Sequence, residues 1–163
     1  MSTQPVPKPR PKPQPLVLPA TVRTLIDNAL VDKRPMLMAH TAPDGQPVLS
    51  YRGSVQVLGD DRLGLWVRNA QGAFLQALAL NPRVAFMVRQ ESSRATYQLQ
   101  GRAYVSAAEA DRTRVFEGAA LAERNHDLER RGVAVIVELD RVEGYAGVGP
   151  AGQIDAICLQ RGA

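Results

Sequence analysis

The sequence predicts a mainly β protein with flanking helices, folded as an antiparallel barrel. Three observations lead to this fold class. About six short runs are rich in β-branched and aromatic residues, turn signals typical of hairpins separate them, and few stretches have helical periodicity. Strands that alternated regularly with helices would instead indicate a parallel βαβ sheet, and this chain lacks that alternation.

Residues 1–18 differ in composition from the rest of the chain. Prolines occupy every second position in the series Pro5, Pro7, Pro9, Pro11, Pro13 and Pro15. Because proline removes a backbone donor and fixes φ, we expect an extended, polyproline-like or disordered arm. Two functions stay open for it, a solubilising tail or a docking arm for an aromatic-lined groove or acidic partner. Residues 19–163 are long enough for a single domain with its own core.

The formal net charge of +4 comes mainly from this arm. Lys8, Arg10 and Lys12 supply three positive charges and no acid accompanies them, which leaves the remaining chain at about +1. A domain whose positive and negative charges nearly cancel is a poor candidate for nucleic-acid binding, because that function needs a clustered basic face. The chain contains neither a run of roughly 20 apolar residues nor the apolar core of a secretion signal. We therefore expect a cytoplasmic protein with no membrane or nucleic-acid partner.

The first half of the predicted domain contains a helix and a hairpin. An apolar stripe predicts a helix over residues 19–34, which Pro35 ends. Residues 36–41 and 47–58 are apolar or β-branched, and the Pro43-Asp44-Gly45 turn between them predicts an antiparallel pair.

The centre of the chain continues this strand-rich pattern. Residues 63–67 form a short apolar strand, and a helical face from Ala73 to Ala79 precedes the stop signal Asn81-Pro82. The chain then enters another strand, which reaches Met87. Residues 94–106 alternate as a strand, and Gly101 within it predicts a bulge or a close backbone approach.

The last third is predicted to hold two helical pieces and the final strands. Ser106 and Glu109 have the spacing of a capping box, so a helix should run from there to about Glu117. Residues 119–131 are predicted to form a second, highly charged helical piece. The predicted strands are a buried run at 133–139, its continuation at 142–145 and an edge strand at 154–159.

Most motifs that carry enzyme chemistry are missing. The chain has no CxxC pair, HExxH or metal-ligand spacing, no GxGxxG or Walker loop, and no GxSxG elbow. We therefore predict no metal site and identify no catalytic residue. The single cysteine, Cys158, excludes an internal disulfide framework. His40 stays open between a titrating group and an ordinary half-buried strand histidine.

Two segments instead predict an anion pocket. Ser50, Tyr51, Arg52, Gly53 and Ser54 place hydroxyls, a guanidinium and an uncovered backbone on one strand. Trp66, Val67, Arg68 and Asn69 end the next strand, and Gln71 and Gly72 follow at a helix start, where free N–H groups favour a phosphate. The alternative is that Arg52 and Arg68 are solvated or form interface salt bridges.

The order of these elements resembles a known family. Residues 36–106, with their Pro-Asp-Gly hairpin and their Ser-Tyr-Arg-Gly-Ser strand, resemble the FMN-binding split-barrel proteins typified by pyridoxamine 5'-phosphate oxidase. The strand ending at Asn69, the helix ending at Asn81-Pro82 and the strand around Gly101 complete the resemblance. It implies a six-stranded antiparallel split β-barrel that forms a homodimer, with FMN bound at the subunit interface.

The resemblance also implies roles for individual residues. Arg52 matches an arginine that contacts the flavin and its phosphate. Trp66 to Asn69 match a strand end against the ring and ribityl chain, Gln71 and Gly72 fall near the phosphate loop, and Thr96 falls near a position that reaches the cofactor.

The chain also departs from this family pattern. The true oxidases carry Ser-Arg-Lys in the loop where this chain has Gly72-Ala73-Phe74, and the lysine after their strand arginine becomes Gln56 or Val57. Their substrate-binding arginine segment has no counterpart after Gly147, so oxidation of vitamin B6 phosphates is not expected. We expect an FMN-dependent oxidoreductase of unknown small-molecule substrate that uses NAD(P)H or another small reductant. The alternatives are a non-catalytic flavin- or haem-binding sensor on the same fold and a deazaflavin (F420)-dependent reductase.

Overall fold

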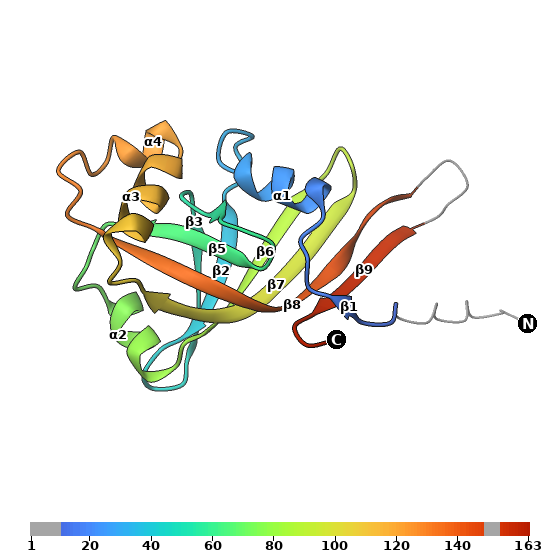
Figure 1. The fold of residues 1–163 in the computed structure, drawn as a ribbon, viewed down its shortest axis with the longest axis horizontal. Helices are drawn as coiled ribbons and strands as arrows, with labels where there is room; N and C mark the ends of the chain where they lie inside the picture. Colours follow the sequence, from blue (N-terminus) through green and yellow to red (C-terminus); the bar gives the residue numbers. More distant parts are fainter. Residues whose placement is uncertain (1–10, 149–153) are drawn as a thin grey trace, which may run out of the picture.

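The computed structural model describes residues 11–148 and 154–163 (Figure 1). Four helices lie in these ranges: α1 (Ala20–Asp27), α2 (Ala73–Leu80), α3 (Glu109–Gly118) and α4 (Leu121–Arg124). The strands of the same ranges are β1 (Gln14–Pro15), β2 (Met36–Thr41), β3 (Pro47–Arg52), β4 (Gln56–Val57), β5 (Arg62–Val67), β6 (Arg83–Gln90), β7 (Ala95–Val105), β8 (Val133–Val148) and β9 (Ile154–Gln160). The predicted mainly β class is therefore confirmed. None of the described helices has the length and apolarity needed to cross a membrane.

The described strands form one open sheet. Its order is β1-β9-β8-β7-β6-β2-β3, and β5 pairs with β8 on one side and with β4 on the other. All pairs are antiparallel except β1 with β9, so the sheet is mixed. The described residues contain nine strands, and the expected six-strand barrel count is not confirmed.

Two segments account for the additional strands. The predicted strand 47–58 is interrupted after Arg52, and its far end forms β4, which pairs with β5 instead of continuing along β2. Gln14 and Pro15 of the arm pair with the end of β9, and Leu18 is buried. An edge position suits proline because that strand does not have to donate on both sides. Residues 1–10 of the arm lie outside the described residues.

The bulge predicted at Gly101 is present in the long β7–β8 pair. The register between these strands shifts between Gln100 and Gly101. A Cβ built on Gly101 would overlap the Glu138 carbonyl and lie 3.1 Å from the Leu139 Cα. Only glycine leaves room for this close backbone approach.

Two helical predictions are wrong in extent. The helix predicted to reach Arg34 ends at Asp27, and the chain then turns until Lys33, whose positive φ of 59° ends any helical path. The Asp27 Oδ1 accepts a hydrogen bond from the Val57 N–H at 2.8 Å, which fixes the helix end on β4. In the predicted helical piece 119–131, only α4 is helical, because this charged segment has no apolar stripe to pack.

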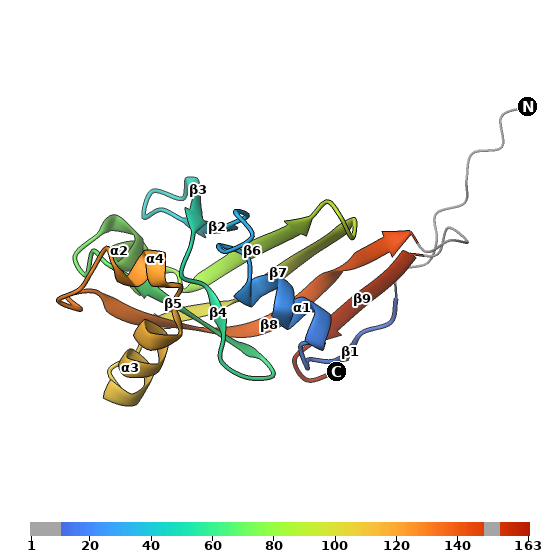
Figure 2. The same cartoon turned by 90° about the horizontal axis from the view of Figure 1, so that it is seen from above.

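The larger part of the core lies under α1 and α2, and a second buried cluster packs α3 against β5 and β8. The fully buried side chains include Leu18, Ile26, Met36, Met38, Leu65, Phe86, Leu99 and Leu139. Both views place α2, α3 and α4 towards one end of the sheet, and α1 with the β8–β9 hairpin towards the other (Figures 1 and 2). The helices thereby bring three separate segments of the chain to one end of β5.

Candidate functional site

A cavity of about 670 Å³ lies between β3, the turn from β5 into α2, and the segment after α3. Its lining residues are Tyr51, Arg52, Gly53, Ser54, Trp66, Val67, Arg68, Asn69, Gly72, Ala73, Phe74, Glu123 and His126. Nine of the twelve residues predicted for the anion pocket line this cavity. Its volume is in the range of small-molecule and cofactor sites.

Arg52 carries the positive charge inside this cavity. Alternation along β3 leaves Tyr51 exposed and turns Arg52 inward, where its guanidinium lies 4.4 Å from the centroid of the Phe74 ring. Its Nε is buried without a hydrogen-bond partner, and burial lowers the pKa of Arg52. No carboxylate of the described residues forms an ion pair with it. A cation with no counter-charge is costly to bury, so an anion that reaches it is bound favourably.

Two further unpaired polar atoms lie behind Arg52. Ser50 Oγ and His40 Nδ1 are both buried without a partner. The His40 ring packs against Phe74 with a centroid distance of 5.0 Å. Burial first, and the charge of Arg52 second, lower the pKa of His40. Neither residue lines the cavity, and Ser50 is thus one of the three predicted residues outside it.

Ser54 ties the segment between β3 and β4 to β5. Its Oγ donates to the Trp66 carbonyl at 3.0 Å and accepts from the Trp66 N–H at 3.0 Å. Both hydrogen bonds lie where the predicted strand 47–58 is interrupted. The Ser54 hydroxyl therefore holds the wall together.

The Trp66 side chain packs mainly against α3 and the segment after it, although Trp66 also lines the cavity. Its side chain is buried, its ring makes an edge contact with Phe116 at 5.0 Å, and the Arg112 guanidinium lies over it. The indole N–H donates to Asp127 Oδ2 at 2.8 Å. This packing is the ordinary core role of a strand tryptophan.

The turn into α2 supplies open backbone donors. Asn69 Oδ1 accepts from the Gln71 N–H at 3.1 Å, and the Asn69 carbonyl accepts from the Gly72 N–H. Gly72 then begins the helix without a side-chain cap, which leaves the first N–H groups of α2 facing outward. Arg68 is exposed at the strand end, on the same lining. Gln71 is exposed and lies outside the lining.

Thr96 lies in another part of the molecule. It faces Arg89 and Tyr145 across the sheet and lines a separate cavity of about 450 Å³ with them. One copy of the chain therefore does not bring Thr96 to Arg52. The described residues contain no cluster of His, Cys, Asp or Glu that fits a metal ion.

Four residues that line the cavity were not among the site residues predicted from the sequence: Ala73, Phe74, Glu123 and His126. Phe74 belongs to a helical face that the sequence assigns to the core, and it is also buried. Glu123 and His126 come from a charged segment without a motif, about seventy residues after Arg52 in the chain. Only the packing of α3 and α4 beside β5 places them in this cavity (Figure 1).

The fold was compared with known proteins. No family model and no curated protein sequence matches the chain. The structure is similar to a pyridoxamine 5'-phosphate oxidase-related, FMN-binding protein from Nostoc punctiforme, with a TM-score of 0.58 and 11% identity over 82% of this chain and 90% of that chain.

Two other solved structures are similar to the same extent. One is a protein from Clostridium acetobutylicum related to general stress protein 26 of B. subtilis, of the pyridoxinephosphate oxidase family (TM-score 0.58, 13% identity, 83% of this chain and 93% of that one). The other is PhzG from Burkholderia lata, solved with tetrahydrophenazine-1-carboxylic acid (TM-score 0.58, 12% identity, 86% and 90%). The chain therefore has the fold of the pyridoxamine 5'-phosphate oxidase-like proteins.

Proposed function

We infer that the chain binds FMN in the cavity between β3 and α2 and acts as an FMN-dependent oxidoreductase. The observation that carries this proposal is Arg52, a cation with a buried, unpaired Nε that lines a cofactor-sized cavity. A doubly charged phosphate supplies the missing acceptor and counter-charge. The similar solved structures, which include an FMN-binding protein, add support.

The residues at the cavity fit the parts of FMN. Arg52, Arg68 and the open N–H group of Ala73 at the start of α2 would hold the phosphate. Tyr51, Val67 and Phe74 offer apolar and aromatic surface for the ring. A bound flavin would supply hydride transfer, and the protein would orient it and control access to it.

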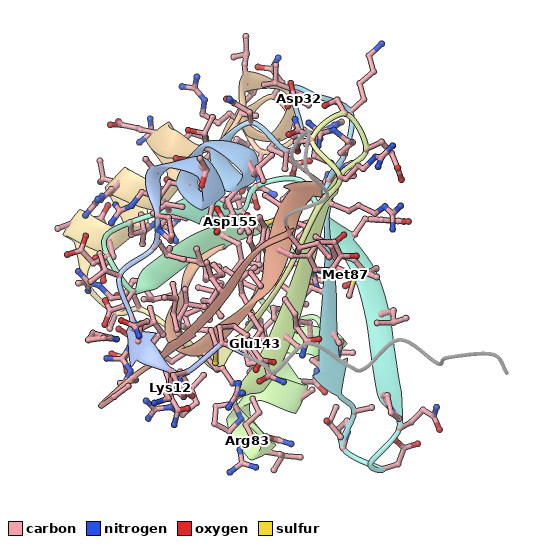
Figure 3. All side chains as sticks on the ribbon, turned by 90° about the vertical axis from the view of Figure 1, so that its right-hand side faces the viewer. Lys12, Asp32, Arg83, Met87, Glu143 and Asp155 are labelled. Atoms are coloured by element: carbon pink, nitrogen blue, oxygen red, sulfur yellow. The ribbon has the colours of Figure 1, made fainter. Side chains whose placement is uncertain are left out.

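We further propose that two copies of the chain complete the site. On β3, Tyr51 pairs with Leu37 of β2 and Leu49 with Ala39 of β2, and Leu37 pairs in turn with Met87 on β6. Leu49, Tyr51 and Met87 are exposed on this outer face, and Figure 3 labels Met87 there. An exposed apolar sheet face is typical of an interface. Because Tyr51 belongs to both this face and the cavity, the second copy would border the cofactor.

The absorbance spectrum of the purified protein, with mass spectrometry of the released ligand, tests the cofactor. Flavin bands and FMN are expected, whereas a haem or deazaflavin spectrum contradicts the FMN assignment. In an FMN titration, Arg52→Ala and Arg68→Ala should each weaken binding at least about tenfold, the loss of one charge-assisted contact. Arg62→Ala, which removes an exposed arginine outside the cavity, is the matched control.

Two further measurements test the enzyme and the dimer. Anaerobic bleaching of the flavin by NADH or NADPH, followed by reoxidation by an acceptor, supports an oxidoreductase, and a flavin that stays oxidised favours a sensor. Sedimentation should give a dimer that Leu49→Lys dissociates. FMN affinity should then fall on dilution below the dimer constant.

A further inference from the structure

The segment after α3 adds a carboxylate to the cavity. Glu123 on α4 lines the same cavity as Arg52, and His126 lies on the same wall. The Glu123 side chain is half-buried, and its carboxylate forms no hydrogen bond or ion pair with the described residues. A carboxylate inside a cavity without a partner is available to a ligand.

Gly53 makes the room in which this carboxylate lies. A Cβ built on Gly53 would overlap the Glu123 carboxylate, whose Cδ is 3.0 Å away. The sequence predicted that the uncovered backbone of Gly53 admits a ring or phosphate, and Glu123 occupies this space in the structure. The carboxylate thereby lies against the strand that carries Arg52.

The segment that carries Glu123 is anchored to the wall of the cavity. Asp127 accepts hydrogen bonds from the Trp66 indole and from the Gly132 N–H, each at 2.8 Å. Arg112 donates to the Gly132 carbonyl. These contacts fix Asp127, four residues after Glu123, against the wall of the cavity.

The charge balance of the cavity with FMN bound indicates which kind of ligand Glu123 binds. This inference rests on the proposed function. An FMN phosphate carries about two negative charges at neutral pH, which Arg52 and Arg68 compensate. Glu123 is then the one lining charge among the described residues that has no counter-charge. Desolvating such a carboxylate is unfavourable unless a cation pairs with it.

We propose that Glu123 selects a substrate with a positively charged amino group and binds that group in the FMN-loaded cavity. The carboxylate accepts hydrogen bonds from the ammonium of the substrate, and Gly53 keeps the space for this contact open. Glu123 is thus a specificity-determining residue. A neutral or anionic analogue of the same shape leaves the carboxylate desolvated and unpaired.

The test uses the FMN-loaded full chain and three probes of similar shape: benzylamine, benzyl alcohol and benzoate. Perturbation of the flavin absorbance gives a Kd for each. Benzylamine should bind at least about tenfold more tightly than either analogue, and Glu123→Gln should abolish this preference, because charge-assisted hydrogen bonds are about twice as strong as neutral ones. Glu129→Gln is the matched control, because Glu129 pairs with Arg131 outside the cavity and its loss should leave the preference intact.

Three results would overturn the inference while the proposed function stands. They are equal affinity for the three probes, no spectral response to benzylamine, and an unchanged preference in Glu123→Gln. The FMN affinity of each variant is measured first in the same titration. Wild-type protein that takes up no FMN overturns the proposed function, and with it this inference.

Discussion

Replacing Asp127 by alanine should destabilise the protein and loosen the wall that carries Glu123. The Asp127 carboxylate accepts three hydrogen bonds, from the Trp66 indole, the Gly132 N–H and the Arg131 N–H. The indole lies in a buried side chain, and leaving such a donor unpaired costs about 1–3 kcal/mol. The Gly132 N–H is also buried, whereas the Arg131 contact is exposed and adds less, so we expect a total loss of about 3 kcal/mol.

Urea unfolding followed by tryptophan fluorescence measures this loss directly, because Trp66 is the single tryptophan of the chain. For a domain of this size, about 3 kcal/mol corresponds to a fall in Tm of roughly 6–12 °C. Asp127→Asn keeps an oxygen for the indole and should lose less than half as much. An Asp127→Ala protein with unchanged stability and unchanged emission would refute the assigned role of this carboxylate.

Three other predictions concern acid stability, the bulge and the cavity. Burial raises the pKa of Asp127, but hydrogen bonds from Gly132, Arg131 and Trp66 outweigh it and lower the pKa below its ordinary value. The stabilisation is therefore complete above the unfolded-state pKa of about 3.9 and disappears as the pH falls through the lower folded-state pKa. Unfolding free energies at pH 3 and pH 6 should differ less in Asp127→Asn than in the wild type, and an equal difference would contradict this. Gly101→Val should lower the free energy of unfolding by about 3 kcal/mol or more, because its side chain overlaps the Glu138 carbonyl; an unchanged thermal melt would show that the strands move apart at little cost. Arg52→Ala should weaken FMN binding without lowering the stability of the FMN-free protein, because it removes a half-buried cation whose Nε is buried without a partner. A large loss of stability in that variant would assign Arg52 a structural role instead.

Local patterns in the sequence were sufficient for most elements of the fold. β-Branched runs bounded by turns predicted β2, β5, β7 and β8, because strand formation there depends on neighbouring residues and on alternation. Gly101 predicted the bulge, since a missing side chain is visible in the sequence itself. Local sequence patterns did not predict the interruption of the strand after Arg52. At the break, Ser54 between β3 and β4 bonds to Trp66 on β5, a contact between segments that are distant in the sequence.

The candidate site likewise has some residues that the local sequence predicted and others that only the tertiary structure brings together. The sequence by itself singled out the two segments around Arg52 and Arg68 that line one cavity, because guanidinium groups, glycine and a helix start are visible as residue type and local order. Only the tertiary structure decided that Glu123 and His126 share their cavity and that Thr96 lies elsewhere. It also gave the space above Gly53 to a carboxylate. The physical reason is that cavity walls form where distant segments pack, and the packing of α3 and α4 beside β5 depends on buried contacts such as Trp66 with Phe116, which no local pattern records.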